Sequence, residues 1–220
     1  MKLALFDFDG TLFRKDTLPY LGQEWKRQGL PLGRLIKTYM KIMPLLLQYR
    51  TKTMTPETFK YHAVQKFHTI FYGMTEPEVD LFFLRAYSRL RQYYHPLVLQ
   101  EIKKARREGF HTVLLSGAYR HLLQHAASDL GINTVLAMDI YFRDGLVDPD
   151  RPLPFILGPS KYQLLMDAFG EQNIDWSQSR SYADSCSDVP VLEIVGYPMV
   201  VNPEPELLEY AYRQKWPLLT

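Results

Sequence analysis

The sequence predicts an α/β fold in which a doubly wound, mostly parallel sheet carries an inserted all-helical domain. From 95 to 220, short apolar runs alternate with amphipathic helical stretches, the pattern of a parallel sheet covered on both faces. From 17 to 94, apolar residues recur instead at three- and four-residue spacing, which indicates helices alone. We therefore assign 1–16 and 95–220 to an α/β core domain and 17–94 to the inserted helical domain.

The core begins with a short apolar run that ends in Asp7, Phe8 and Asp9 and turns at Gly10 and Thr11, as a buried strand would. Later strands are expected at 110–116, 134–139, 179–184 and 198–202, and helices at 97–109, 121–131, 160–170, 189–196 and 205–215. An Asp-Gly pair inside 139–148 predicts a β-hairpin.

The inserted segment is expected to form four helices. Pro56 and Pro77 suit the first turns of two of them. Pro44 lies inside a helical pattern and is expected to kink or split that helix. The Tyr and Phe residues of the segment are expected to form the core of the helical bundle more often than to stack on a substrate.

Composition describes an ordinary globular protein, with 46% hydrophobic and 23% charged residues. Cys186 is the single cysteine, so no intrachain disulfide can form, which fits a reducing compartment. The first apolar stretch meets Asp7 too early for a signal-peptide core, and the run at 42–47 is too short to cross a bilayer. We expect a cytoplasmic protein without a membrane or nucleic-acid partner.

Charge is unevenly distributed along the chain. Residues 14–94 carry 14 Lys and Arg against 6 Asp and Glu, a net of +8, and the remainder carries −6, which together make the total of +2. Such a basic segment is compatible with nucleic acid, a membrane surface or a small anionic ligand, and equally with an ordinary solvated helical surface.

Polar residues with catalytic potential follow three separate predicted strands: Asp7 and Asp9, Ser116, and Asp184. In open α/β sheets ligands bind at the carboxyl ends of the strands, so we expect these residues to meet there. Asp188 would add a fourth carboxylate to Asp7, Asp9 and Asp184. Such a cluster needs a cation, and oxygen ligands favour Mg²⁺, although any one of these aspartates alone would suit a turn or a helix cap.

A phosphate site is the second expectation. Ser116 and Gly117 directly follow an apolar run, so a hydroxyl and backbone N–H groups would face the sheet edge at the start of a helix. Lys161 lies near the start of another predicted helix, where a cation gains nothing from the helix dipole and needs a different anion. Taken singly, each of these residues is also typical of an ordinary turn or surface.

Together these motifs resemble those of the haloacid dehalogenase superfamily. DFDGTL at 7–12 resembles its first motif, LLSGAY at 114–119 the second, Lys161 the third and YADSCSDVPVL at 182–192 the fourth. The insert between the first two motifs is similar to the helical cap of the phosphoserine phosphatase-like subfamily, so we name residues 17–94 the cap segment. The resemblance implies a Rossmann-like core.

The resemblance also implies a role for each motif residue. Asp7 would be the nucleophile that forms an aspartyl phosphate, and Asp9 the general acid and base. Mg²⁺ would be held by Asp7, the backbone carbonyl of Asp9 and Asp184, with Asp188 behind a coordinated water. Ser116, Gly117 and Lys161 would bind the phosphoryl oxygens. Ser185 stands where many relatives have glycine.

The implied activity is Mg²⁺-dependent hydrolysis of a small phosphorylated metabolite. The acid at Asp9 is absent from dehalogenases, because a halide leaves without a proton. Asp16, directly before the cap segment, and Lys66 within it are the candidate substrate residues. The cap segment lacks the Phe-x-x-Ser-Leu-x-x-Arg run of phosphoserine enzymes. A phosphotransferase or mutase with the same intermediate, and a non-catalytic binding protein, remain alternatives.

The His121–His125 pair and Cys186 are expected to have structural and not functional roles. His121 and His125 are spaced to share one helix face, but no third metal ligand accompanies them, so a solvated helix is expected. Cys186, between the fourth-motif aspartates, is expected to be a small packed residue and not a second nucleophile.

Overall fold

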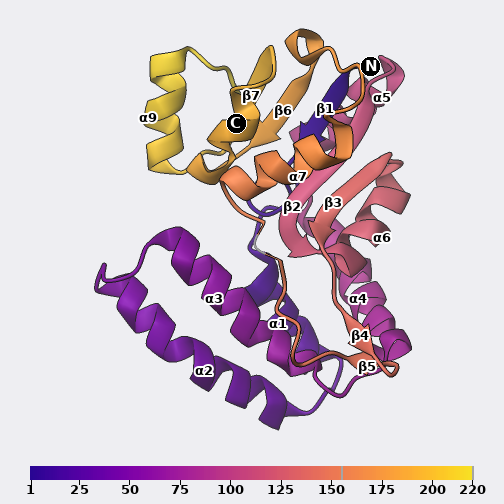
Figure 1. Ribbon diagram of the computed structural model, residues 1–220, viewed down its shortest axis with the longest axis vertical. Coiled ribbons are helices and arrows are strands. Elements are labelled where there is room, and N and C mark those ends of the chain that lie inside the picture. Colours follow the sequence, from indigo (N-terminus) through magenta and orange to yellow (C-terminus); the bar gives the residue numbers. More distant parts are fainter. Residues whose placement is uncertain (155, 220) are drawn as a thin grey trace.

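A six-stranded parallel sheet forms the centre of the molecule (Figure 1). The structure is a computed structural model that describes residues 1–154 and 156–219. The strand order is β3-β2-β1-β6-β7-β8, and every neighbouring pair is parallel. The strands are β1 (Leu3–Phe6), β2 (His111–Tyr119), β3 (Thr134–Met138), β6 (Arg180–Ala183), β7 (Tyr197–Val201) and β8 (Leu218–Leu219). The predicted doubly wound parallel sheet is confirmed.

Alternate residues of β1 face opposite layers of helices. Leu3 and Leu5 belong to a cluster with residues of α7 (Pro159–Phe169) and α8 (Val189–Leu192). Ala4 and Phe6 belong to the cluster that contains residues of α5 (Pro96–Arg107) and α6 (Arg120–Leu130). Because both faces of the strand are covered, its residues form a continuous apolar run, and each buried leucine contributes about 1.5–3 kcal/mol. A third cluster joins α9 (Pro205–Gln214) to β7.

The cap segment contains the four predicted helices, α1 (Thr17–Arg27), α2 (Leu32–Arg50), α3 (Pro56–His68) and α4 (Glu76–Leu90). Short 3₁₀ turns η1 (Thr69–Phe71) and η2 (Arg91–Tyr93) follow α3 and α4. Pro56 and Pro77 lie in the first turns of α3 and α4, as expected. Helix α2 passes through Pro44 without a break, so the helix is not split there, and a kink at Pro44 stays a prediction. Pro44 is exposed, and water can therefore hydrate the carbonyl that its missing N–H leaves free.

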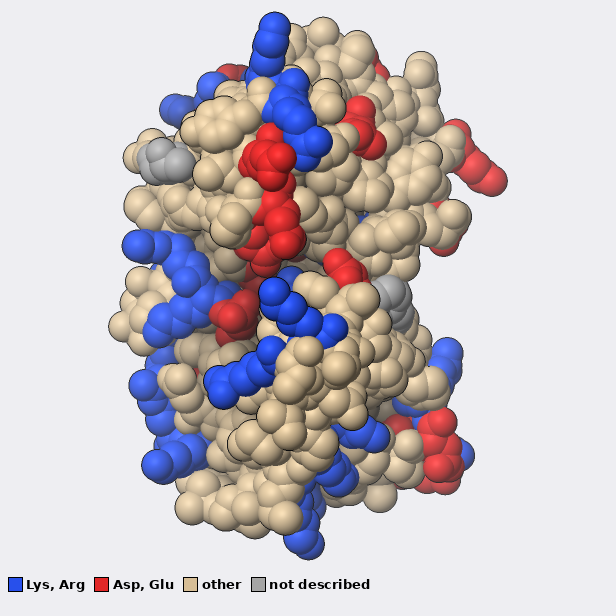
Figure 2. All heavy atoms as spheres, turned by 90° about the vertical axis from the view of Figure 1, so that its left-hand side faces the viewer, with Lys and Arg blue, Asp and Glu red and all other residues tan. Residues whose placement is uncertain are grey.

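Buried aromatic residues of the cap segment share one cluster with the sheet. Trp25, Phe71 and Phe83 are in the same cluster as Phe6 and Tyr119, which supports the expectation that cap aromatics serve mainly as core. The boundaries of the two proposed domains stay a prediction. Figure 2 shows Lys and Arg side chains over the lower half of one face, at the height of the cap helices, and a run of Asp and Glu side chains above them.

The chain departs from the predicted elements at a few places. Strand β2 continues to Tyr119 and α6 begins only at Arg120, so Ser116 and Gly117 lie inside a strand and not at a helix start. The two-residue strand β8 was not predicted, and α8 is shorter than expected. The predicted hairpin is confirmed as β4 (Phe142–Arg143) and β5 (Leu146–Val147).

The pair His121 and His125 packs on α4 instead of facing solvent along a free helix. His121 stacks on Phe83 and His125 stacks on Tyr87. No helix within 1–154 and 156–219 is both long and apolar enough to cross a membrane.

Candidate active site

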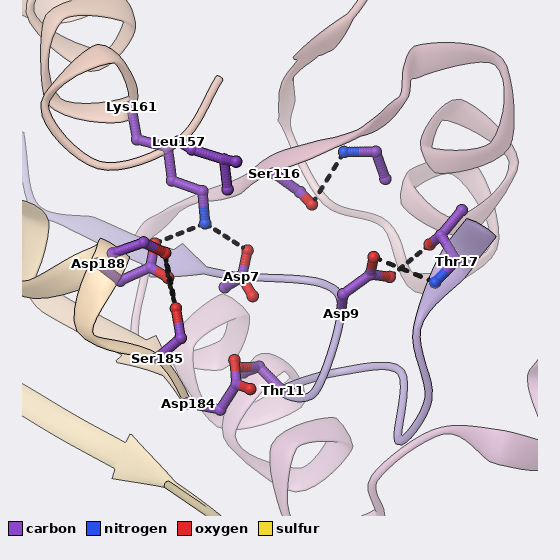
Figure 3. A network of polar contacts seen from close by, with 12 residues as sticks. Asp7, Asp9, Thr11, Thr17, Ser116, Leu157, Lys161, Asp184, Ser185 and Asp188 are labelled. Atoms are coloured by element: carbon purple, nitrogen blue, oxygen red, sulfur yellow. Dashed lines mark hydrogen bonds and ion pairs between the residues drawn. The ribbon is translucent and has the colours of Figure 1, made fainter. Parts of the chain in front are cut away.

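Three adjacent strands bring the predicted residues to one edge of the sheet. Strand β1 lies between β2 and β6, with Phe6 in register with Leu114 and Tyr182. Asp7 directly follows β1, Asp184 directly follows β6, and Ser116 lies two residues beyond Leu114 on β2. The sequence expectation that these residues meet at the carboxyl ends of neighbouring strands agrees with this arrangement (Figure 3).

Lys161 bridges two of the aspartates from the first turn of α7. Its Nζ donates to Asp7 Oδ1 at 2.8 Å and to Asp188 Oδ1 at 2.6 Å, and all three side chains are buried. Burial alone would lower the pKa of Lys161, but the charges and hydrogen bonds of Asp188 and Asp7 raise it above its usual value. The lysine therefore stays charged and is aimed at the position beside Asp7.

The carboxyl group of Asp7 has a raised pKa. Burial raises its pKa to about 6, against the opposing charge of Lys161 and with the charge of Asp188 adding to the rise. Its backbone N–H donates to Tyr182 O at 3.0 Å, which holds the residue against the end of β6. A buried carboxylate fixed by one cation and one strand is well placed to act as a nucleophile.

Asp9 points away from the other carboxyl groups, toward α1. Its Oδ2 accepts from the Thr17 backbone N–H at 3.1 Å, and its Oδ1 accepts a very short hydrogen bond from the Thr17 hydroxyl (Figure 3). Burial raises the pKa of Asp9 to about 7, although both bonds from Thr17 oppose the rise. The group can therefore hold or release a proton near neutral pH, as a general acid and base must.

Asp184 packs against the turn after Asp9. Thr11 Oγ1 donates to Asp184 Oδ1 at 3.0 Å, and Gly10 adopts φ +75° directly beneath the carboxyl group. A Cβ at position 10 would lie 2.0 Å from Asp184 Oδ2, so the close approach requires glycine. Burial raises the pKa of Asp184 to about 8, and the charges of Asp7 and Asp188 add to the rise.

The carboxylates of the site fit Mg²⁺ held by one or two aspartates, and not by all four aspartate side chains. Within 1–154 and 156–219, no group of three or more His, Cys, Asp or Glu side chains is arranged to hold a metal ion. Thr17 holds the Asp9 carboxyl group, while Lys161 and the hydroxyls of Ser185 and Ser187 hold Asp188. Lys161 donates to Asp7 Oδ1 and Thr11 to Asp184 Oδ1, so the Oδ2 atoms of these two carboxylates could hold a cation. Mg²⁺ commonly takes one or two carboxylates with water. Burial is the main cause of the raised pKa of Asp184, and a cation there would offset the repulsion from Asp7 and Asp188 that adds to it.

The Ser116–Gly117 segment offers polar groups without a helix N-terminus. Ser116 Oγ accepts from the Ala118 backbone N–H at 3.2 Å. At Gly117 a Cβ would lie 2.7 Å from the carbonyl oxygen of Ile156, so glycine lets the 156–157 loop approach β2. The pairing of β2 with β3 shifts register between Leu115 and Tyr119, and this irregular stretch contains both residues.

A cavity of about 390 Å³ opens over this edge and extends into the cap segment. Its lining includes Asp7, Asp9, Asp16, Ser116, Gly117, Lys161, Asp184 and Asp188. Asp16 precedes α1 and makes no side-chain capping bond, so its exposed carboxyl group is available to a ligand. Lys66 is exposed on α3 and is not among the described lining residues, whereas Lys60 of the same helix is.

Sequence reasoning assigned no role to Thr11, Thr17 or Ser187. Thr11 and Ser187 stand inside the quoted motifs, so their positions were a usable signal. No motif in the sequence marks Thr17. Its two hydrogen bonds to Asp9 form only because the fold places the start of α1 beside the turn after β1.

Comparisons with known proteins agree with the motif assignment. The model of the haloacid dehalogenase-like hydrolase family matches residues 4–193. The chain is 27% identical over 134 residues to the inhibition of morphological differentiation protein of Streptomyces azureus, a match covering 59% of this chain and 48% of that protein. It is 26% identical over 110 residues to phosphoserine phosphatase SerB2 of Mycobacterium tuberculosis, covering 50% and 27%.

These two curated relatives are longer proteins, and the matches span less than half of either. Among solved structures, a protein of unknown function from Bordetella pertussis Tohama I superposes with a TM-score of 0.83 at 21% identity. That superposition covers 100% of this chain and 98% of the other, so the two share the whole fold.

Proposed function

The chain belongs to the haloacid dehalogenase-like hydrolase family, and from that premise we propose that it is a Mg²⁺-dependent phosphatase of small phosphorylated metabolites. One observation carries the proposal: Asp7 and Asp9 line one cavity, with Asp7 held by Lys161 and Asp9 poised near pKa 7. A nucleophile fixed by a cation, together with an acid that titrates near neutrality, suits phosphoester cleavage through a covalent intermediate.

The reaction proceeds in two displacements. A carboxylate oxygen of Asp7 attacks phosphorus, and the bond from phosphorus to the substrate oxygen breaks as Asp9 donates its proton to that oxygen. Asp9, now ionised, then takes a proton from a water molecule that attacks the aspartyl phosphate. The bond from phosphorus to Asp7 breaks, and inorganic phosphate leaves. Thr17 fixes the orientation of the Asp9 carboxyl group in both steps.

Charge on the transferring group is balanced by the residues around Asp7. Lys161 places its ammonium beside Asp7 Oδ1, where it would also meet a phosphoryl oxygen, and Ser116 and Gly117 would offer donors on the other side. Mg²⁺, held by Asp7, the Asp9 carbonyl and Asp184 with Asp188 behind, would neutralise phosphate charge when bound. Asp188 also anchors Lys161 at 2.6 Å. The expected compartment of the protein is the cytoplasm.

The test is phosphate release from a panel of phosphomonoesters with Mg²⁺, after EDTA, and after Mg²⁺ is restored. Asp7→Asn is expected to reduce turnover more than about a thousandfold, because an amide cannot form the phosphoenzyme. Asp167→Asn, on the exposed face of α7, makes the same chemical change away from the cavity and is expected to retain activity.

Three outcomes count against the proposal. Asp7→Asn activity within tenfold of wild type at an unchanged melting temperature removes Asp7 from its role. Full activity in EDTA removes the metal. Adding an alcohol acceptor tests the phosphotransferase alternative, since a transferase would pass the phosphoryl group to the alcohol in preference to water.

A further inference from the structure

The cavity extends well beyond the groups that would bind phosphate. From Asp7 it extends to residues of α2 and α3, and Tyr119, Met138 and Ile156 line it on the core side. The cap residues that line it are mostly apolar or aromatic: Leu18, Pro19, Tyr39, Ile42, Tyr49, Pro56, Phe59, Tyr61, Ala63, Val64 and Phe67. A volume of about 390 Å³ lies within the range of small-ligand sites, so a substrate's alcohol portion has room there.

Charged groups are scarce in this outer part of the cavity. Away from the carboxylate edge, the charged residues of the described lining are Asp16, directly before α1, Lys60 of α3 and Glu204 of the core, and no arginine is among the described lining residues. Lys60 lies 3.9 Å from Glu204 of the core, with both side chains about half exposed. An amino acid or a sugar needs a hydrogen-bonding or ionic partner for each polar group that it buries. These walls provide few such partners beyond tyrosine hydroxyls.

Aromatic rings from both α2 and α3 line the cavity. Tyr49 of α2 and Phe59 of α3 stack with centroids 4.9 Å apart and planes 16° from parallel. Tyr39 and Tyr49 line the cavity while remaining 40% and 39% exposed, so the apolar lining continues to the molecular surface. An apolar chain longer than the cavity can therefore extend outward along α2.

We propose that the substrate is the phosphomonoester of an apolar alcohol, with its phosphate at Asp7 and its hydrocarbon against the apolar side chains of α2 and α3 that line the cavity. This inference rests on the proposed phosphatase activity and names the substrate class of the same site. Burying the hydrocarbon against these side chains provides the binding energy, and the phosphate end provides the chemistry. The apolar alcohol is either a linear alkyl chain or an aromatic ring system, and the experiment separates the two.

The experiment measures kcat/KM for linear monoalkyl phosphates from methyl to decyl, each below its micelle concentration. Phenyl and naphthyl phosphate test aromatic alcohols, and phosphoserine and a hexose phosphate test polar ones. Each buried methylene is expected to raise kcat/KM about threefold to fourfold until the cavity is full. Phosphoserine is expected to remain near methyl phosphate. A gain confined to the naphthyl ester assigns an aromatic alcohol in place of an alkyl chain.

Two neighbouring residues of α2 provide a matched pair of variants. Ile42 lines the cavity, whereas Met43 is 61% exposed and is not among the described lining residues. Ile42→Gln is expected to reduce the ratio of decyl to methyl kcat/KM at least tenfold, because it places an amide against the chain. Met43→Gln is expected to leave that ratio unchanged.

The outcomes distinguish this inference from the function on which it rests. A flat dependence on chain length and ring size, or a clear preference for phosphoserine or the hexose phosphate, overturns the substrate class and leaves the phosphatase standing. Equal ratios for Ile42→Gln and Met43→Gln, both folded by melting temperature, also overturn it. The absence of Mg²⁺-dependent phosphate release from every ester rejects the phosphatase, and the substrate class with it.

Discussion

At the scale of single residues, the position of the Asp184 carboxyl group depends on the absence of a side chain at Gly10. Gly10 carries no side chain, adopts φ +75° and lies under Asp184. Alanine there would meet two separate penalties. Its backbone would be strained by about 1–2 kcal/mol in the left-handed region, and its Cβ would lie 2.0 Å from Asp184 Oδ2.

Gly10→Ala is therefore expected to displace Asp184 as well as to reduce stability. The measurements are the free energy of unfolding in urea and the Mg²⁺ concentration that gives half-maximal activity. Gly73→Ala is the control, because Gly73 has φ +76° and no atom within 4 Å of its added Cβ. Both variants should lose backbone stability, and Gly10→Ala alone should require more Mg²⁺. Equal effects would show that the contact with Asp184 is unimportant.

At the scale of elements, α2 tolerates a proline that should have interrupted it. Pro44 lacks the N–H that would bond to the carbonyl of Met40, yet the helix continues from Leu32 to Arg50. Met40 is 69% exposed, so solvent reaches this face of the helix. The packing of α2 against α1 and α3 maintains the helix despite the missing bond.

Pro44→Ala is expected to raise the free energy of unfolding by about 2 kcal/mol, because it restores one backbone hydrogen bond and removes a ring from a helix interior. Urea unfolding measures the change. Pro56→Ala is the control, since Pro56 is in the first turn of α3, where the N–H has no partner within the helix. We expect that variant to change stability by less than about 1 kcal/mol. A destabilising Pro44→Ala would indicate that α2 needs the proline geometry.

At the scale of the whole molecule, a buried histidine lies where the cap segment meets the sheet. His68, the last residue of α3, is 2% exposed, and its ring lies among Phe71, Tyr72 and Tyr119. Neither ring nitrogen has a hydrogen-bond partner within the described part of the chain. Burial lowers the pKa of His68 to about 4.

Stability should therefore fall with pH across a defined window. The unfolded chain takes up a proton at His68 below about pH 6.5, while the folded chain does so only near pH 4, so acid favours unfolding between these values. His68→Phe removes this site and keeps an aromatic ring. Relative to wild type, the variant should gain about 2 kcal/mol in unfolding free energy between pH 7.5 and pH 5. A pH-independent difference would mean that His68 is protonated equally in both states.

The motifs of this chain made much of its site predictable from the sequence. DFDGTL, Ser116–Gly117, Lys161 and the run around Asp184 each follow an apolar strand or begin a helix, and the parallel sheet aligns the strand ends. Parallel strands place their carboxyl ends at one edge whatever the rest of the chain does. This is why residues separated by more than a hundred positions could be assigned to one site before their distances were known.

Local pattern also determined most of the elements. Alternating helices and apolar runs predicted the sheet and its covering helices, and the four cap helices follow from their apolar spacing. The exceptions include α8, which ends at Leu192, β8, with only two residues, and the end of β2 beyond Ser116. A two-residue strand has no periodicity to detect, and a strand extended by pairing with β3 depends on a partner remote in sequence.

Only the tertiary structure decided how the polar groups divide their roles. The sequence placed four aspartates together, and in the fold Asp9 accepts from Thr17, Asp7 and Asp188 share Lys161, and Asp184 accepts from Thr11. Likewise Lys60, and not Lys66, lines the cavity, because the packing of α3 sets which side of the helix faces the sheet edge. Residue type and spacing determine which strand end or helix carries a group. The partner that a side chain reaches depends on packing between segments that are remote in sequence, which no local pattern encodes.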